Sequence, residues 1–359
     1  MNFDCASQMP PDPELVRFHA EAVAGTAWNQ EASHAAAKRV RRQIGEAAEI
    51  LTSSLYGDCR PRRVIWGNSA TGVFRLLADF ASGGRVLTTR LEHPAVTANL
   101  KRTAAKVDFL RCDAAGVLDA ESSPREKYDA VFCHAVQSEL GTVQRAAEIF
   151  APHPDALHVV DAVALAGKAP LAGCRGVTVI SGSKFGCPGG AAAMIDDDCP
   201  QGEKLFAFAG HYRTRDYLTD RVAPAVILTL AEAARRRRER MAPDEANAVK
   251  NALLLRAGVA DLPLCLTVPM EKSSPYIVHL TLRDLPGAVV VRSLSERGII
   301  AASGSACASE SREPSPAMLA IGQNRKNAYN SLRLSFGFDT AADDVARLTE
   351  TLAETLNTL

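Results

Sequence analysis

The sequence has no long apolar run, no paired cysteine motif and no excess of charge of either sign. Its 41 Lys and Arg residues balance 41 Asp and Glu residues, so no overall field favours nucleic acid or an anionic membrane as a partner. The nine cysteines are scattered, odd in number and without a CxxC pair, which argues against a disulfide framework and a cysteine zinc site. A membrane span needs about 18 consecutive apolar residues, and no such run occurs.

The N-terminus is acidic and rich in proline, and it lacks the basic region and apolar stretch of a signal peptide. Unpaired cysteines suit a reducing compartment. We therefore expect a cytoplasmic protein with no metal site, no direct binding to nucleic acid and no contact with a membrane.

The chain has 359 residues, of which 47% are hydrophobic, enough for two domains with sizeable cores. Through its first two thirds, short β-branched runs alternate with amphipathic stretches, a pattern typical of a mainly parallel sheet covered by helices on both faces. We expect strands at 63–66, 85–89, 107–111, 130–134, 158–160, 177–181 and 191–195. We expect helices at 69–81, 93–105, 145–150 and from 224 to 240 and beyond.

After about residue 248 the pattern changes to one of strands with flanking helices, which predicts a smaller α+β domain. We expect strands at 264–268, 276–282, 288–291 and 332–336, and a C-terminal helix at 341–356. The predicted large domain covers 15–245, and the small domain combines 1–14 with 246–359. The four arginines at 235–238 are flanked by Glu232 and Glu239, so we interpret them as a solvated helix face.

Lys184 directly follows an apolar strand and precedes a turn rich in glycine. Most lysines at strand ends are merely solvated. The small residues around this one leave room for a planar ligand, and a desolvated lysine has a lowered pKa and forms Schiff bases.

Two further features lie at predicted strand ends. Asp161 follows an apolar strand, where an aspartate either caps a turn or keeps the ring nitrogen of a pyridine cofactor protonated. Gly67-Asn68-Ser69-Ala70-Thr71-Gly72 lies between a strand and a helix. It suits either an ordinary helix N-cap or a phosphate site built from amides and hydroxyls.

Together these features resemble the class V pyridoxal-phosphate enzymes, and within them the cysteine desulfurases of the NifS/IscS type. The resemblance covers nearly the whole chain and is least specific at the N-terminus. It implies an α/β fold of fold type I, with a mainly parallel mixed sheet in the large domain and the catalytic-cysteine loop on the small one. It also implies bound pyridoxal 5′-phosphate and a homodimer.

Several motifs carry this resemblance. Ser181-Gly182-Ser183-Lys184 is similar to Ser-Gly-His-Lys, which makes Lys184 the Schiff-base lysine. The segment 91–96 contains the family's ring-stacking histidine as His93, and 137–144 is similar to Asn-Asn-Glu-x-Gly-x-x-Gln. The cofactor-binding residues that the resemblance implies are Lys184, Asp161, Ala70, Thr71, His93, Gln137, Ser181 and, reaching the neighbouring subunit's phosphate, Thr219.

The most specific match is the segment 303–309, with 313–315 and 319–322 after it. In the family this is a mobile loop carrying the catalytic cysteine, here Cys307. A cysteine among small residues is more often a buried hydrophobe, but the complete flanking match favours catalysis. Arg333, in a strand similar to Ile-Arg-x-Ser-x-Gly, is expected to hold the substrate carboxylate in a bidentate fork.

Some positions depart from the family pattern. Ala164 stands where a glutamine is usual, Ser183 replaces the histidine before the lysine, and Gln137 replaces an asparagine. The segment 210–219, which includes Thr219, matches only loosely. These changes suggest a diverged desulfurase that serves a dedicated acceptor.

The resemblance implies that L-cysteine becomes L-alanine. Lys184 removes the α proton, His93 helps to move protons, and Cys307 takes the sulfur as a persulfide for an acceptor protein. The acceptor pathway stays open among iron–sulfur assembly, tRNA thiolation and DNA phosphorothioation. One alternative is a carbon–sulfur or selenocysteine lyase that does not need Cys307, and another is a degenerate homologue that only binds partners.

Overall fold

The computed structural model describes residues 1–215, 222–304 and 313–359, and for 211–215 the backbone only. Its larger sheet has seven strands in the order β1-β7-β6-β5-β4-β2-β3. Strand β7 is antiparallel to both of its neighbours, and the other neighbouring strands pair in parallel. The strands are β1 (Arg62–Gly67), β2 (Arg85–Thr89), β3 (Lys106–Leu110), β4 (Ala130–His134), β5 (Leu157–Asp161), β6 (Val177–Ser181) and β7 (Ala191–Asp196). All seven predicted strands are confirmed, with ends that shift by one residue at most.

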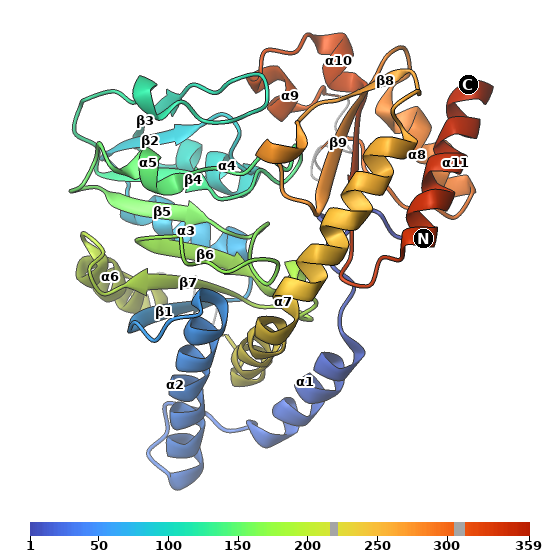
Figure 1. The fold of residues 1–359 in the computed structure, drawn as a ribbon. Helices are drawn as coiled ribbons and strands as arrows, with labels where there is room; N and C mark the ends of the chain where they lie inside the picture. The colour runs from blue at the N-terminus through green and yellow to red at the C-terminus, as the bar shows by residue number, and fades with distance from the viewer. Residues whose placement is uncertain (216–221, 305–312) are drawn as a thin grey trace.

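Helices cover both faces of this sheet (Figure 1). One face packs against α3 (Ala70–Phe80), α4 (Pro94–Arg102) and α6 (Gly202–Arg215). The other packs against α2 (Ala35–Tyr56), α5 (Ala146–Phe150) and the start of α7 (Pro224–Gly258). Side chains alternate along each strand, so Phe132 points to the first face while Val131 and Cys133 point to the second. The expected α/β architecture is confirmed.

The smaller sheet is antiparallel, in the order β10-β9-β8. Its strands are β8 (Leu264–Leu266), β9 (Ile277–Leu282) and β10 (Ser331–Ser335), and α8 (Gly287–Glu296), α11 (Ala342–Thr358) and the end of α7 pack on it. The first residues of the chain join this unit, since Phe3 is buried in its core and Asp4 bridges to Ser335. The boundary at 245 and 246 falls inside α7, and the division into domains stays a prediction.

Two expectations were wrong. Residues 288–291 form part of α8 and not a strand, because Val290 and Leu294 lie one helical turn apart and are both buried. The arginines at 235–238 are not all solvated. Arg237 is buried, donates to Asp244 at 2.6 Å and lies 3.5 Å over the ring of Phe338.

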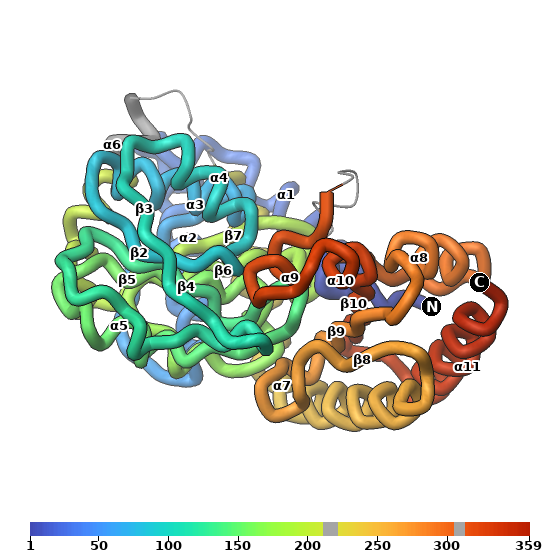
Figure 2. The backbone as a smooth tube through the Cα atoms, turned by 90° about the horizontal axis from the view of Figure 1, so that it is seen from above, coloured from blue at the N-terminus to red at the C-terminus, as the bar shows by residue number. Residues whose placement is uncertain are grey.

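Besides α8, five further helices were not predicted: α1 (Pro13–Gly25), α2, α6, α9 (Pro316–Ala320) and α10 (Arg325–Tyr329). Seen from above, α9 and α10 lie where the two sheets approach each other (Figure 2). In the described residues, no helix combines the length and the apolar character needed to cross a membrane.

Candidate active site

The carboxyl ends of β1, β2, β4, β5 and β6 meet at one edge of the large sheet, as the strand pairings require. Ligands of open α/β sheets bind at such an edge. A cavity of about 300 Å³ opens there. Seven of the predicted site residues line it, namely Lys184, Asp161, His93, Ala70, Thr71, Ser181 and Arg333. Cys307 and Thr219 lie outside the described residues.

Lys184 reaches this cavity because β6 ends at Ser181 and the chain then makes one turn of 3-10 helix. The turn needs glycine at Gly182, where a Cβ atom would come within 2.6 Å of the carbonyl oxygen of Gly189. The amine Nζ of Lys184 donates a hydrogen bond to the backbone carbonyl of Ser7. A segment far away in sequence therefore contacts the candidate anchor lysine directly.

Asp161 is the last residue of β5 and is only 8% exposed. One carboxylate oxygen, Oδ1, accepts a hydrogen bond from the backbone N–H of Val163 at 2.9 Å. Burial raises the pKa of Asp161 to about 7, and the nearby Glu92 adds to this effect. A cationic N–H group in the cavity would lower that pKa again, so the site suits a protonated aromatic nitrogen.

A buried network that sequence reasoning missed lies beside Asp161. Oε1 of Glu92 accepts from both the backbone N–H and Nδ1 of His134, each at 2.8 Å. Nε2 of His134 lies 3.2 Å from the side-chain amide of Gln144. The only signal was the Glu-His pair at 92 and 93, because the partners of Glu92 come from another strand.

His93 caps α4, and its Nδ1 accepts the backbone N–H of Ala95 at 3.0 Å. That bond assigns the proton of the neutral ring to Nε2. Burial lowers the pKa of His93, and the nearby positive charge of Lys184 lowers it further. Both effects disfavour the charged ring, and the hydrogen bond from Ala95 orients the ring at the cavity wall.

The N-terminus of α3 forms another wall. Ser69 caps the helix by accepting from the N–H of Gly72 at 3.1 Å, and Ala70 and Thr71 form the first turn. The first amides of a helix have no partner within the helix, and together with its dipole they favour a phosphate group. The hydroxyl of Ser181 also lines the cavity, 3.1 Å from the hydroxyl of Ser183.

Arg333 lies in β10 with a side chain that is 3% exposed. Nη2 donates to Oδ1 of Asp4 at 2.6 Å and to Oγ of Ser7 at 2.5 Å, and Nη1 donates to the carbonyl of Ser138 at 2.9 Å. Nε is buried and has no hydrogen-bond partner in the described part of the chain. The contacts with Asp4 and Ser7 were not predicted.

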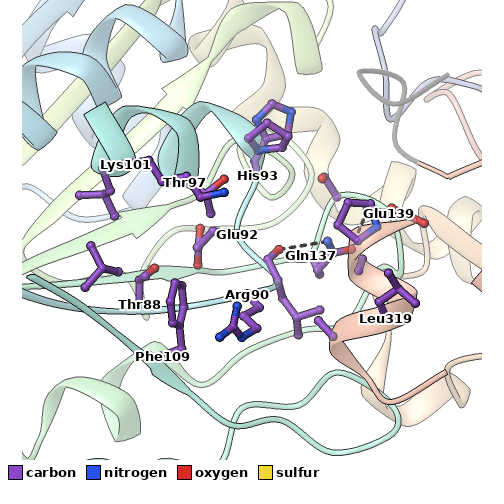
Figure 3. Close-up of a pocket in the computed structure, with 18 residues that line it drawn as sticks. Thr88, Arg90, Glu92, His93, Thr97, Lys101, Phe109, Gln137, Glu139 and Leu319 are labelled. Carbon is purple, nitrogen blue, oxygen red and sulfur yellow. Dashed lines mark hydrogen bonds between the residues drawn. The ribbon is translucent and has the colours of Figure 1, made fainter. Parts of the chain in front are cut away.

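Gln137 does not line the cavity of Lys184. It lines a neighbouring cavity of about 450 Å³, shown in Figure 3, which shares Leu91, His93 and Ser138 with the first. Its Nε2 donates to the carbonyl of Leu91 at 3.2 Å, and its Oε1 accepts from the N–H groups of Glu139 and Leu140. Both ends of this amide bind backbone groups.

Two departures from the family pattern lie in the Lys184 cavity. Ala164 and Ser183 both line it, and the carbonyl of Ala164 accepts from Nζ of Lys168 at 3.1 Å. Lys168 is 3% exposed, and burial lowers its pKa to about 8. This second buried lysine was not predicted.

The sequence and the fold of this chain are both similar to those of known proteins. Residues 17–348 match the family model of the class-V aminotransferases. The chain is 29% identical to an IscS-like cysteine desulfurase of Mycobacterium tuberculosis, across 97% of this chain and 94% of that protein. It is 26% identical to the cysteine desulfurase IscS of Vibrio atlanticus, across 96% and 89%. A solved NifS-like protein superposes with a TM-score of 0.84 at 20% identity, covering 100% of both chains.

Proposed function

The chain belongs to the class-V aminotransferase family and is a pyridoxal-phosphate-dependent cysteine desulfurase, and we propose roles for its residues in that reaction. Lys184, Asp161 and Arg333 meet in one cavity, and this juxtaposition carries the proposal. An amine, an acid and a guanidinium are the groups needed to anchor the cofactor, hold its ring nitrogen and bind an amino-acid carboxylate.

The residues present fit pyridoxal 5′-phosphate. The start of α3 and Ser181 supply donors for its phosphate. Asp161 is a buried acid with a pKa of about 7, and a cationic partner would stabilise its carboxylate form. Lys184 is the covalent anchor. When bound, the cofactor supplies a ring that withdraws electrons from the α carbon of the substrate.

Proton transfer falls to Lys184 and His93. Nζ of Lys184 removes the proton from the α carbon of cysteine and is the group placed to return it later. The ring proton of His93 lies on Nε2, which donates a hydrogen bond toward the substrate side. The ring passes this proton on when Nδ1 gives up the N–H of Ala95 and takes up a proton in its place. Asp161 meanwhile keeps a proton on the ring nitrogen.

Cys307 takes the sulfur. Its thiolate attacks the sulfur of the substrate, so that an S–S bond forms while the C–S bond breaks and the electron pair stays with carbon. Protonation of that carbon gives L-alanine, and Cys307 is left as a persulfide. Gly304 is the last described residue before the segment that carries Cys307. It lies close to Glu139 and Ser315.

The remaining roles concern substrate binding, assembly and the sulfur acceptor. Arg333 binds the substrate carboxylate. Gln137, a cofactor contact by the family resemblance, lines the neighbouring cavity and donates to the carbonyl of Leu91, close to His93. The enzyme is a cytoplasmic homodimer in which Thr219 completes the phosphate site of the other subunit. The persulfide passes to an acceptor protein of iron–sulfur assembly, tRNA thiolation or DNA phosphorothioation.

The test is to incubate cofactor-loaded protein with L-cysteine and to locate the persulfide by mass spectrometry. We expect it on Cys307, together with an equal amount of alanine. Cys307→Ser should retain the cofactor and lose the persulfide, while Cys59→Ser, which removes an exposed thiol elsewhere, should behave as wild type. Release of sulfide by Cys307→Ser at the wild-type rate would indicate a lyase, and no turnover by the wild type would indicate a degenerate homologue.

A further inference from the structure

The N-terminal segment, residues 4–9, lines the cavity through Ala6 and Ser7 and contacts both Lys184 and Arg333. Asp4 and Ser7 bind Arg333, and the carbonyl of Ser7 accepts from Lys184. The segment is fixed on both sides, because Phe3 is buried in the small core and the N–H of Met9 donates to the carbonyl of Ser183 at 3.0 Å. Its backbone is therefore a permanent part of the site.

The contacts of Arg333 conflict with its expected task. A guanidinium holds a carboxylate bidentately through one of two edges, Nε with Nη2 or Nη1 with Nη2. Both edges include Nη2, and Asp4 and Ser7 both accept from Nη2, at 2.6 Å and 2.5 Å. A substrate carboxylate cannot use either edge while both acceptors stay in place.

Asp4 is the acceptor that is free to leave. Its side chain is 21% exposed, whereas that of Arg333 is 3% exposed. Its Oδ1 also accepts from the hydroxyl of Ser7 at 2.7 Å, so a rotated Asp4 is able to retain that bond and gain water. Arg333 has no such alternative, because a buried cation left without an anion is strongly destabilised.

We propose that Asp4 is an internal competitor for the substrate carboxylate. It neutralises Arg333 in the absence of an amino acid and gives up Nη2 when an α-amino acid enters. This inference rests on the proposed role of Arg333. Asp4 sets selectivity, because only a ligand whose carboxylate reaches the fork and replaces its charge compensates for the lost ion pair.

The test is Asp4→Asn, which keeps the shape of the side chain and removes its charge. The uncompensated Arg333 then gains more from an incoming carboxylate, so L-alanine should bind about three to ten times more tightly by titration calorimetry. KM for L-cysteine should fall by a similar factor with kcat unchanged within about twofold. Asp4→Ser should show the same direction if Asp4→Asn folds poorly.

Asp12→Asn is the matched control, because Asp12 follows the same segment but lies 3.7 Å from Arg236 instead. It should leave alanine affinity and KM unchanged. Weaker or unchanged alanine binding in both Asp4 variants would overturn the proposal and leave Asp4 as a residue that merely orients Arg333. If Arg333→Lys also left cysteine and alanine binding unchanged, the role of Arg333 itself would fail, which is a distinct result.

Discussion

Asp161 shows how burial changes the behaviour of one residue. Its pKa rises from 3.8 to about 7, so between these values the folded cofactor-free protein binds more protons than the unfolded chain. Stability then falls as pH rises through that window, because the slope of the unfolding free energy follows the difference in bound protons. The loss attributable to Asp161 is on the order of 4 kcal/mol by the linkage relation.

This behaviour is testable with Asp161→Asn, which stays neutral at every pH. In urea unfolding of the cofactor-free proteins, the variant should gain stability relative to wild type between about pH 5 and about pH 8. Cofactor loading of the wild type should reverse the trend, since the proposed pairing with a protonated ring nitrogen would lower the pKa of Asp161. Parallel pH profiles for the two cofactor-free proteins would contradict the assignment.

Lys184 should be the residue that holds the cofactor covalently. Borohydride reduction of the loaded protein followed by peptide mapping should place the pyridoxyl group on Lys184. Lys184→Ala should lose the adduct and its visible absorbance. Lys168→Ala is the informative comparison, because Lys168 is also buried and also has a lowered pKa. An adduct on Lys168 would contradict the assignment of Lys184 as the covalent anchor.

Residues at or just beyond the carboxyl end of a strand of the main sheet were predictable. Asp161 ends β5 and Lys184 lies in the turn after β6, and parallel strands bring such residues to one edge. Asp4 and Ser7 were missed because their partner Arg333 lies 329 and 326 positions away from them in sequence. No local pattern encodes a contact of that kind.

At the scale of elements, periodicity fixed the buried strands well and failed on α8. The run 288–291 is Ala-Val-Val-Val, and such β-branched runs favour strands. Burial one helical turn apart, at Val290 and Leu294, outweighed that preference. A strand would place those two side chains on one face and also bury residue 292, which is Arg292 and is exposed.

The first residue of α8 gives a prediction about packing. Gly287 lies so close to β10 that a Cβ atom would come within 1.8 Å of the carbonyl oxygen of Ser331. Gly287→Ala should therefore destabilise the protein by about 1–3 kcal/mol in chemical unfolding, through overpacking. Gly45→Ala is the control inside α2, where nothing lies within 4 Å of a Cβ atom.

Gly45→Ala should stabilise the protein by about 0.5–1 kcal/mol, because alanine loses less backbone entropy than glycine in a helix. The opposite signs of the two variants separate close packing from helix propensity. Equal changes in the free energy of unfolding for the two variants would show that β10 shifts at little cost to accommodate the added methyl group.

At the scale of the whole molecule, the sequence predicted two sheets but not how the chain passes between them. The long helix α7 begins on the large sheet and ends on the small one. Because one continuous helix joins the two domains, no loop or linker in the sequence marks the domain boundary. The N-terminal segment returns to the small sheet through Phe3 and Asp4. The assignment of residues 1–14 to the small domain anticipated this return, but the contacts of Phe3 and Asp4 depend on packing between distant segments, which local patterns do not reveal.

The last prediction concerns assembly. A phosphate group carries close to two negative charges at neutral pH, and the described donors that we propose for it are the first turn of α3 and the hydroxyl of Ser181. A second chain that contributes Thr219 would add a fixed donor, and cofactor and dimer would then stabilise each other by linkage. Sedimentation equilibrium should show a dimer that dissociates less readily with cofactor than without it. Thr219→Ala should weaken cofactor binding about tenfold and reduce that linkage, the expected loss of one charge-assisted hydrogen bond. A monomer that binds the cofactor as tightly as the dimer would show that one chain completes the site.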